Sequence, residues 1–350
     1  MRALFSIASA VAFALCVSAH AETVRVGSPL VSALTYLDVA HAGQRIVAVG
    51  DRGSILYSDD DGINWVPAKS STSVLLTSVC FADSYNGWAV GHDATVLGTK
   101  DGGETWAVQY SDVLGGADDS AEEDFSEEDY DDYGAYDDYG DDAGAAMPVD
   151  TSGAPFLDVM CDSKERAIAV GGYGYVVETQ DGGESWVKRN EDIPNPDGWH
   201  LYAIERVPGT STLIAAGEKG TLLRSRDNGV SWQKLKSPYG GTFFGITSTF
   251  HVTLIHGMQG KVFASRDGGS TWNLVKTGVT RAVNAGVVLK DGTIILAGAS
   301  GSILVSHDKG SSVALQYLPN RESISGLLPI GTDRLVMVGD RGITLVNDIR

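Results

Sequence analysis

The hydrophobic and polar positions of this chain repeat about every forty residues. Each unit has a small or apolar residue followed by glycine, a short loop, a strand of alternating pattern, and a Ser/Thr-x-Asp-x-Gly turn that precedes tryptophan. The marker glycines of the units are Gly50, Gly91, Gly171, Gly217, Gly257, Gly298 and Gly339. The sixth unit is a decayed copy that ends at Val313, and the seventh is cut short by the chain end. Such a period is the sequence signature of a repeat architecture.

Four short strands in each unit predict an all-β, seven-bladed β-propeller over residues 22–350. In the second unit we expect the strands at Leu76–Phe81, Gly87–Gly91, Thr95–Lys100 and Trp106–Tyr110. The seventh unit lacks a fourth strand. We predict that the N-terminal segment 23–26 supplies it and closes the ring, because an open ring would expose sheet edges.

The turn motif has a structural explanation. Its aspartate accepts backbone N–H bonds across a tight turn, its glycine permits unusual backbone angles, and its tryptophan covers the turn. The residues assigned to this role are Asp60, Trp65, Asp101, Trp106, Asp181, Trp186, Asp227, Trp232, Asp267 and Trp272. Because the set recurs around the ring, whereas an active site occurs once, we interpret it as structural and expect no catalytic residue, metal or cofactor in it.

The first 21 residues have the pattern of a cleavable signal peptide. Arg2 precedes an apolar stretch, and Ala19-His20-Ala21 fits the small-x-small cleavage rule. We therefore expect a periplasmic or secreted protein that starts at Glu22, with no segment inserted in a membrane.

Residues 111–150 form an acidic insertion between the second and third units. They hold sixteen Asp and Glu and no Lys or Arg, and they supply most of the formal net charge of −19. We expect this segment to be disordered, because its like charges repel. Its alternative roles are a solubilising loop, a weak calcium-binding segment, a contact for a basic partner, and a competitor for the arginine surface described below. The remaining chain is nearly neutral, which argues against nucleic-acid binding.

The Gly-x-x-Gly, strand and Asp-turn order at this period resembles the photosystem II stability and assembly factor family of propellers, which carry bacterial neuraminidase (Asp-box) repeats. The resemblance covers the mature chain apart from the acidic insertion. That departure favours a non-photosynthetic bacterial member. The resemblance implies a non-enzymatic helper of a membrane protein complex, and some related proteins are associated with exporters of the resistance-nodulation-division class.

In a propeller, the loops between second and third strands share one face with the connections between blades. Arg52, Arg281, Arg321 and Arg341 fall in these loops on neighbouring blades, and arginine suits carboxylate recognition and protein interfaces. We predict that they form the docking surface, with Tyr173, Trp199 and Lys219 around its rim. The alternative is a set of ordinary ion-paired loop residues, since Asp51 and Asp340 stand beside two of them.

Export leaves Cys80 and Cys161 in an oxidising compartment. Both fall on first strands, of the second and third units. Their side chains either face each other between the blades or point apart, so the pattern leaves a disulfide open.

Two other functions fit parts of the pattern. Asp-turn propellers include sialidases and other glycoside hydrolases, but we find no pair of facing carboxylates outside the turns and the insertion, and no metal-spaced histidines. A carbohydrate- or peptide-binding propeller would show saturable binding without turnover.

Overall fold

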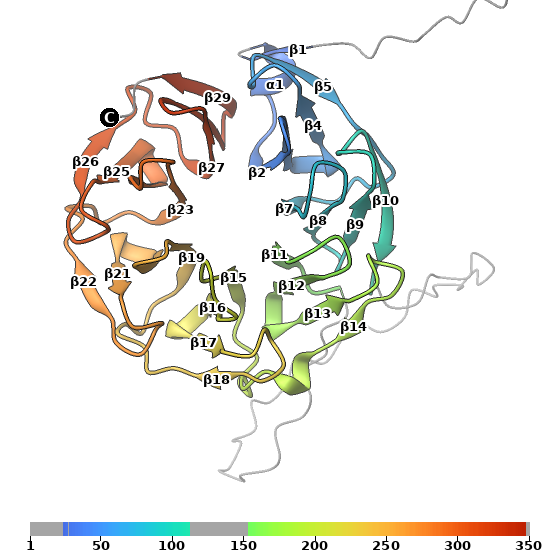
Figure 1. Cartoon of the computed structure of the whole chain (residues 1–350). Coiled ribbons are helices and arrows are strands. Elements are labelled where there is room, and N and C mark those ends of the chain that lie inside the picture. The colour runs from blue at the N-terminus through green and yellow to red at the C-terminus, as the bar shows by residue number, and fades with distance from the viewer. Residues whose placement is uncertain (1–23, 27, 113–152, 348–350) are drawn as a thin grey trace, which may run out of the picture.

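The computed structural model describes residues 24–26, 28–112 and 153–347. They form seven β-sheets arranged as blades around a central channel (Figure 1). The predicted all-β, seven-bladed propeller is confirmed. The predicted signal peptide and nearly all of the acidic insertion lie outside the described residues.

Each blade places its main strands in sequence order from the channel outward. The innermost strands of blades 1 to 7 are β2 (Tyr36–Ala42), β7 (Leu76–Phe81), β11 (Phe156–Cys161), β15 (Leu201–Arg206), β19 (Phe243–Ser248), β23 (Val283–Val288) and β27 (Ile324–Ile330). The second strands are β3 (Arg45–Gly50), β8 (Gly87–Gly91), β12 (Ala167–Gly171), β16 (Leu213–Gly217), β20 (Thr253–Gly257), β24 (Ile294–Gly298) and β28 (Arg334–Gly339).

The third strands are β4 (Ile55–Ser58), β9 (Val96–Thr99), β13 (Val176–Thr179), β17 (Leu222–Ser225), β21 (Val262–Ser265), β25 (Ser302–Ser306) and β29 (Gly342–Asn347). The fourth strands of blades 1 to 6 are β5 (Asn64–Pro67), β10 (Thr105–Tyr110), β14 (Val187–Lys188), β18 (Gln233–Lys234), β22 (Asn273–Val275) and β26 (Ala314–Tyr317). Two short outer strands, β1 (Val24–Arg25) and β6 (Lys69–Ser70), add to blades 1 and 2.

The apolar core is divided into seven clusters, and each cluster fills the space between two adjacent blades. The second strands are fully buried along almost their whole length because a neighbouring blade covers each of their faces. This arrangement explains why these strands are continuously apolar, whereas the short outer strands β14 and β18 are exposed.

The predicted closure of the ring by the N-terminal strand is wrong. β1 pairs antiparallel with β5, at the outer edge of blade 1, so that Val24 lies opposite Trp65. In the described part of the chain, blade 7 has three strands. The ring closes instead through side-chain packing. The short helix α1 (Pro29–Ser32) lies against β29, and its buried Val31 joins an apolar cluster shared by blades 7 and 1. That cluster excludes water from the junction without a shared sheet.

The marker glycines occupy one position in the blade: the last residue of the second strand, opposite the first residue of the innermost strand. In blade 4, the carbonyl oxygen of His200 accepts a hydrogen bond from the Glu218 amide (2.8 Å) and so lies directly over Gly217. A Cβ at Gly217 would stand 2.0 Å from that oxygen. In all seven blades the corresponding distance is 2.0 to 2.3 Å. The repeat therefore needs glycine because two backbone segments touch there.

The Asp turns connect third and fourth strands through one repeated set of hydrogen bonds. In blade 4, Asp227 Oδ1 accepts the Ser231 amide (2.9 Å) and the Ser225 hydroxyl (2.7 Å), while the Ser225 oxygen accepts the Gly229 amide (2.7 Å). The hydrogen bonds from Ser231 lower the pKa of Asp227 to about 2. Blade 6 keeps this set around Asp308, although Val313 replaces the tryptophan.

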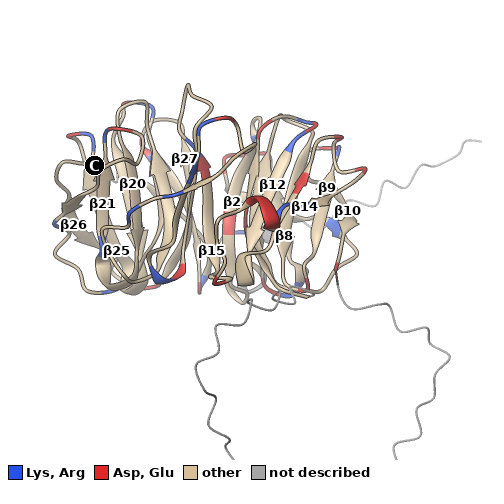
Figure 2. Cartoon of the chain, turned by 90° about the horizontal axis from the view of Figure 1, so that it is seen from below, with Lys and Arg blue, Asp and Glu red and all other residues tan. Residues whose placement is uncertain are grey.

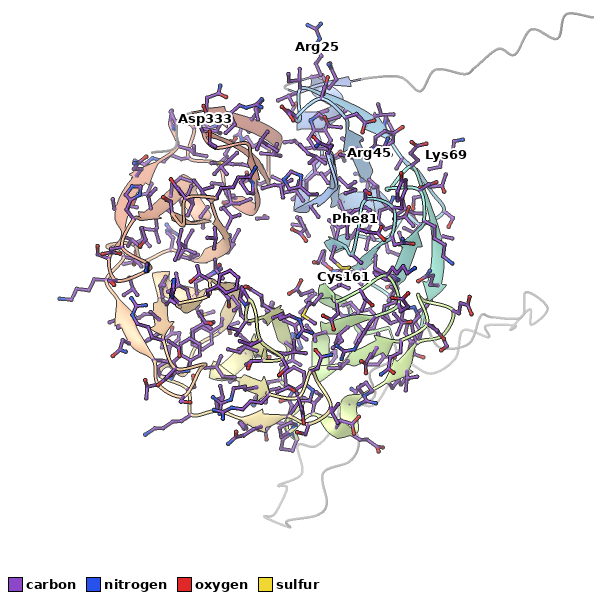
Figure 3. The ribbon with its side chains drawn as sticks, in the orientation of Figure 1. Arg25, Arg45, Lys69, Phe81, Cys161 and Asp333 are labelled. Atoms are coloured by element: carbon purple, nitrogen blue, oxygen red, sulfur yellow. A yellow bond between two sulfur atoms is a disulfide. The ribbon has the colours of Figure 1, made fainter. Side chains whose placement is uncertain are left out.

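A disulfide joins Cys80 of β7 to Cys161 of β11, with a Cα–Cα distance of 5.8 Å (Figure 3). Of the two orientations left open by the sequence, the side chains therefore face each other between blades 2 and 3. The bond crosses the same pair of blades that the acidic insertion separates in sequence. Asp112 and Gly153, which flank the segment outside the description, meet through a hydrogen bond from the Gly153 amide to the Asp112 carbonyl (2.7 Å).

Candidate partner-binding face and central channel

One face of the propeller carries the turns between second and third strands together with the connections between blades. We call it the loop face. Five of its turns are 3-10 turns of one shape: η1 (Asp51–Gly53), η2 (Gly172–Gly174), η4 (Glu218–Gly220), η5 (Met258–Gly260) and η6 (Ala299–Gly301). Their central residues, Arg52, Tyr173, Lys219, Gln259 and Ser300, have φ between 52° and 58°. This left-handed conformation is uncommon outside glycine. In each of these five turns, the side chain of the central residue lies on the loop face, and the glycine that follows it is buried.

Four predicted arginines lie on consecutive blades of this face. Arg281 and Arg321 precede the innermost strands of blades 6 and 7, and Arg341 and Arg52 occupy the turns of blades 7 and 1. All four are exposed. Arg52 lies 4.0 Å from Asp51, an exposed pair that contributes little to stability, and Arg321 stacks on Tyr317 (3.8 Å). Arg281 and Arg341 form no ion pair with any described residue. We call these four residues the arginine side.

The other predicted residues lie across the channel, on blades 3 and 4 (Figure 1). The Lys219 ammonium stands 5.6 Å from the centre of the Trp199 ring, and Tyr173 packs edge-on against His200 at 5.0 Å. They are therefore grouped with one another on the loop face, on the opposite side of the ring from the arginines.

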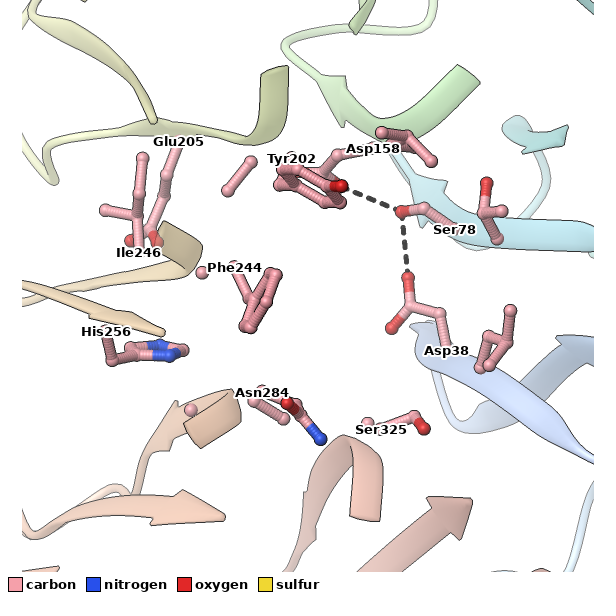
Figure 4. Close-up of a pocket in the computed structure, with 18 of the residues that line it drawn as sticks. Asp38, Ser78, Asp158, Tyr202, Glu205, Phe244, Ile246, His256, Asn284 and Ser325 are labelled. Atoms are coloured by element: carbon pink, nitrogen blue, oxygen red, sulfur yellow. Dashed lines mark hydrogen bonds between the residues drawn. The ribbon is translucent and has the colours of Figure 1, made fainter. Parts of the chain in front are cut away.

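Two further aromatic residues, which sequence reasoning missed, continue this group into the channel. Tyr202 follows His200 at 6.2 Å, and Phe244 follows Tyr202 at 5.3 Å. Both are second residues of innermost strands, and both project into the channel (Figure 4). We call Tyr173, His200, Tyr202 and Phe244 the aromatic row. A closer alignment of the repeat units would have shown an aromatic residue at this position in both the fourth and the fifth unit.

The central channel holds a cavity of about 400 Å³ that is lined by the innermost strands of all seven blades. Its wall at blades 1 to 4 contains three half-buried acids, Asp38, Asp158 and Glu205, which sequence reasoning also missed (Figure 4). Each accepts a backbone N–H from the next blade: Asp38 from Val79 (2.9 Å), Asp158 from Ile204 (2.8 Å) and Glu205 from Ser248 (2.8 Å). The acids thus join the innermost strands of neighbouring blades, which do not share a sheet.

Ser78 links the acids of blades 1 and 3. Its Oγ lies 2.9 Å from Asp38 Oδ2 and 2.9 Å from Asp158 Oδ1 (Figure 4). A hydroxyl has one proton to donate, so both contacts are hydrogen bonds only when one of the two carboxyls is protonated. Burial raises the pKa of Asp38 to about 7 and also raises the pKa of Asp158, which agrees with a proton held in this group.

On the far wall, His256 is fully buried, and its ring nitrogens lie 3.2 Å from the Val283 carbonyl and 3.2 Å from the Thr247 hydroxyl. Burial lowers the pKa of its imidazole to about 4, so the ring is neutral near pH 7. In the described part of the chain, no three His, Cys, Asp or Glu side chains gather in a way that would hold a metal ion. The weak calcium binding predicted for the acidic insertion concerns residues outside the description.

Changing Glu205 to glutamine is expected to flatten the dependence of stability on pH. Burial raises the pKa of Glu205 to about 7, above its ordinary value of about 4.5. Between these values the folded chain binds more protons than the unfolded chain, so its stability falls as the pH rises through this window. The variant lacks this loss and keeps an acceptor for the Ser248 amide. It should gain up to about 3 kcal/mol relative to the wild type between about pH 5 and pH 8.

Urea unfolding at those two pH values measures this difference. Glu184→Gln, which removes an exposed carboxyl, is the matched control and should leave the pH dependence unchanged. The same pH dependence in the wild type and in Glu205→Gln would contradict a raised pKa for Glu205.

Comparison with known proteins shows which family the chain is similar to. The family model described as "Photosynthesis system II assembly factor YCF48" matches residues 145–313. A "Photosystem II assembly lipoprotein Ycf48" from Synechococcus sp. (strain CC9902) is 28% identical over 175 residues, which cover 48% of this chain and 50% of that protein. Its counterpart from Synechococcus sp. (strain CC9605) is 30% identical over 169 residues, with 48% and 50% covered. The chain is a β-propeller that resembles photosystem II assembly factors over about half of its length.

The predicted resemblance is therefore confirmed, although the match spans about half the length of these curated relatives. Solved structures agree on the propeller fold. "YCF48 bound to D1 peptide" superimposes with a TM-score of 0.66 at 16% identity, over 94% of this chain and 97% of that one. "YCF48 from Cyanidioschyzon merolae" gives 0.62 at 15% identity, over 93% and 98%. Among the described residues of this chain, no helix has the length and apolarity to cross a membrane.

Proposed function

We propose that this chain is an exported, non-enzymatic assembly factor that binds a segment of a membrane protein through its loop face. The observation that carries the proposal is the arginine side: four exposed guanidinium groups on consecutive blades, three of them without an ion pair to a described residue. Guanidinium groups bind carboxylates in bidentate geometry and are common in protein interfaces.

Three further observations support parts of the proposal. The relatives named above are assembly proteins, and one solved structure is described as bound to a D1 peptide. Both curated relatives are named lipoproteins, which supports export of this chain. The Cys80–Cys161 disulfide supports the same conclusion, because disulfides persist in oxidising compartments. An exporter of the resistance-nodulation-division class is the alternative membrane partner that the family resemblance suggests.

Changing Arg52, Arg281, Arg321 and Arg341 together to glutamate is expected to abolish partner capture. The reversed charges would repel a carboxylate-bearing partner, so recovery of a membrane protein from mildly crosslinked envelopes should fall about tenfold or more. Quantitative mass spectrometry of the tagged protein measures this recovery and names the partner.

The matched control changes four exposed basic residues near the Asp turns, on the opposite face, to glutamate: Lys100, Arg226, Lys290 and Lys309. It alters the net charge by the same amount, and recovery should stay at the wild-type level. Equal recovery with both variants, or equal loss with both, would contradict docking through the arginine side. Turnover of sialosides or β-glucans would instead support the glycosidase alternative.

A further inference from the structure

The aromatic row forms a continuous path of rings from the edge of the loop face to the mouth of the channel. It begins at the turn of blade 3 with Tyr173, passes through His200, and reaches the channel wall at Tyr202 and Phe244. Successive ring centres are 5.0 to 6.2 Å apart, so no gap separates the members. The row lies across the channel from the arginine side.

Burial in the core does not account for these rings. The neighbouring core aromatics Phe156, Tyr175 and Phe243 are fully buried. In contrast, Tyr173 is 50% exposed, and the other members of the row are half-buried. Tyr173 also holds a left-handed backbone conformation that aromatic residues rarely adopt. A connected group of aromatic rings open to solvent on one face is typical of a binding surface.

The channel beside the row has room for a ligand side chain. At the next position along the innermost strands, blades 4 to 7 carry only Ala203, Gly245, Ala285 and Gly326. The cavity of about 400 Å³ is consequently open beside Tyr202 and Phe244, and the wall around them also carries the polar side chains of Asp158, Glu205 and His256. A leucine or phenylalanine side chain would bury most of its apolar surface there.

The ring geometry favours a peptide over a sugar. Tyr173 meets His200 at 76°, and Tyr202 meets Phe244 at 82°. His200 and Tyr202 are tilted at 46°. The row therefore has no flat platform on which a series of sugar rings would stack. Edges and faces that alternate in this way form an uneven apolar surface that suits branched or aromatic side chains.

Charge complementarity indicates which charged groups the bound segment should carry. Across the channel, Arg281 and Arg341 are exposed and have no ion pair with a described residue. An extended segment that crosses the mouth of the channel would place carboxylates at the arginines and an apolar residue at the row. We propose that the aromatic row is a second anchor site, which takes an apolar side chain of an extended acidic segment held by the arginine side. This inference rests on the proposed function and specifies its partner.

Binding of synthetic peptides to the purified full chain, followed by fluorescence anisotropy, tests this anchor. The probe is a labelled Gly/Ser peptide with a Phe-Leu pair at one end and a Glu-Asp-Glu trio at the other, with spacers of about two, six and ten residues. Matched peptides replace Phe-Leu with Ser-Ser, or the acids with their amides. The variants are Tyr173→Asn, which keeps a residue that tolerates the left-handed turn, and Tyr202→Ala with Phe244→Ala.

With the best spacer, we expect each variant to bind the complete peptide about fivefold to tenfold more weakly than the wild type does. The variants should bind the Ser-Ser peptide as the wild type does, because that peptide has no group for the row. Phe250→Ser removes an aromatic residue that is 77% exposed in a loop between a first and a second strand, on the opposite face, and should change nothing.

The two proposals fail differently. Binding that depends on the acids and the arginines, but is equal in the wild type and in Tyr173→Asn, would overturn the anchor and leave the proposed function standing. Displacement of the peptide by a β-glucan oligosaccharide would assign the row to a carbohydrate and overturn the anchor. Absence of binding by the wild type for every spacer would overturn both proposals.

Discussion

Replacing Gly217 with alanine is expected to destabilise the propeller by more than about 3 kcal/mol. The new Cβ would stand 2.0 Å from the His200 carbonyl oxygen, which is closer than real Cβ contacts come. To relieve the clash, the innermost and second strands of blade 4 would have to separate, and the hydrogen bond from the Glu218 amide to the same oxygen would be lost. The φ of Gly217 is −166°, so the cost comes from the contact and not from the backbone angle.

The free energy of unfolding in urea measures this effect, with far-ultraviolet circular dichroism as the probe. Gly240→Ala is the matched control, since a Cβ at Gly240 meets nothing within 4 Å. It should change stability by less than about 0.5 kcal/mol. Equal stability of Gly217→Ala and Gly240→Ala would show that the repeat glycine serves another purpose.

Removing the disulfide with Cys80→Ser and Cys161→Ser is expected to cost about 4 kcal/mol. The bond closes a loop with a sequence separation of 81 residues. Without the bond, the unfolded chain gains the conformational entropy of this long loop, and the free energy of unfolding falls. The folded contact between blades 2 and 3 should change little, because the loss arises in the unfolded chain. There the apolar cluster and the hydrogen bond from Thr77 to the Phe156 carbonyl (2.7 Å) would remain.

The unfolding midpoint in urea, with and without a reducing agent, checks this expectation. Reduction should shift the wild type to the midpoint of the double variant and leave the variant unchanged. A thiol assay under denaturing, non-reducing conditions should find no free thiol in the mature wild type. A double variant as stable as the oxidised wild type would show that packing alone holds these blades together.

The features that depend on neighbouring residues were predictable from the sequence. The period of the glycines and Asp turns predicted seven blades, and the expected strands of blade 2 agree with β7 to β10 within one residue at each end. This agreement has a physical basis. The turn of blade 4 is built by Ser225, Asp227 and Ser231, and each is bonded within four residues of its partner. The loop-face positions of the arginines follow from the same repeat, because a repeat position determines the face.

Features made by residues far apart in the chain were not predictable. The N-terminal strand joins β5 because a sheet edge accepts any extended segment with matching hydrogen bonds, and the sequence alone does not rank the two edges. The cysteine pair needed the true spacing between β7 and β11. The contacts of Ser78 with both Asp38 and Asp158 needed three blades to converge.

The sequence by itself therefore determined the blade, its turns and the number of repeats, since these depend on short-range hydrogen bonds and on apolar patterning. The tertiary structure decided how the ring closes, which acids line the channel, and that the aromatic row and the arginine side lie opposite each other. Those outcomes depend on how the blades pack around a common axis, and that packing sets both the distances between distant side chains and their exposure to water.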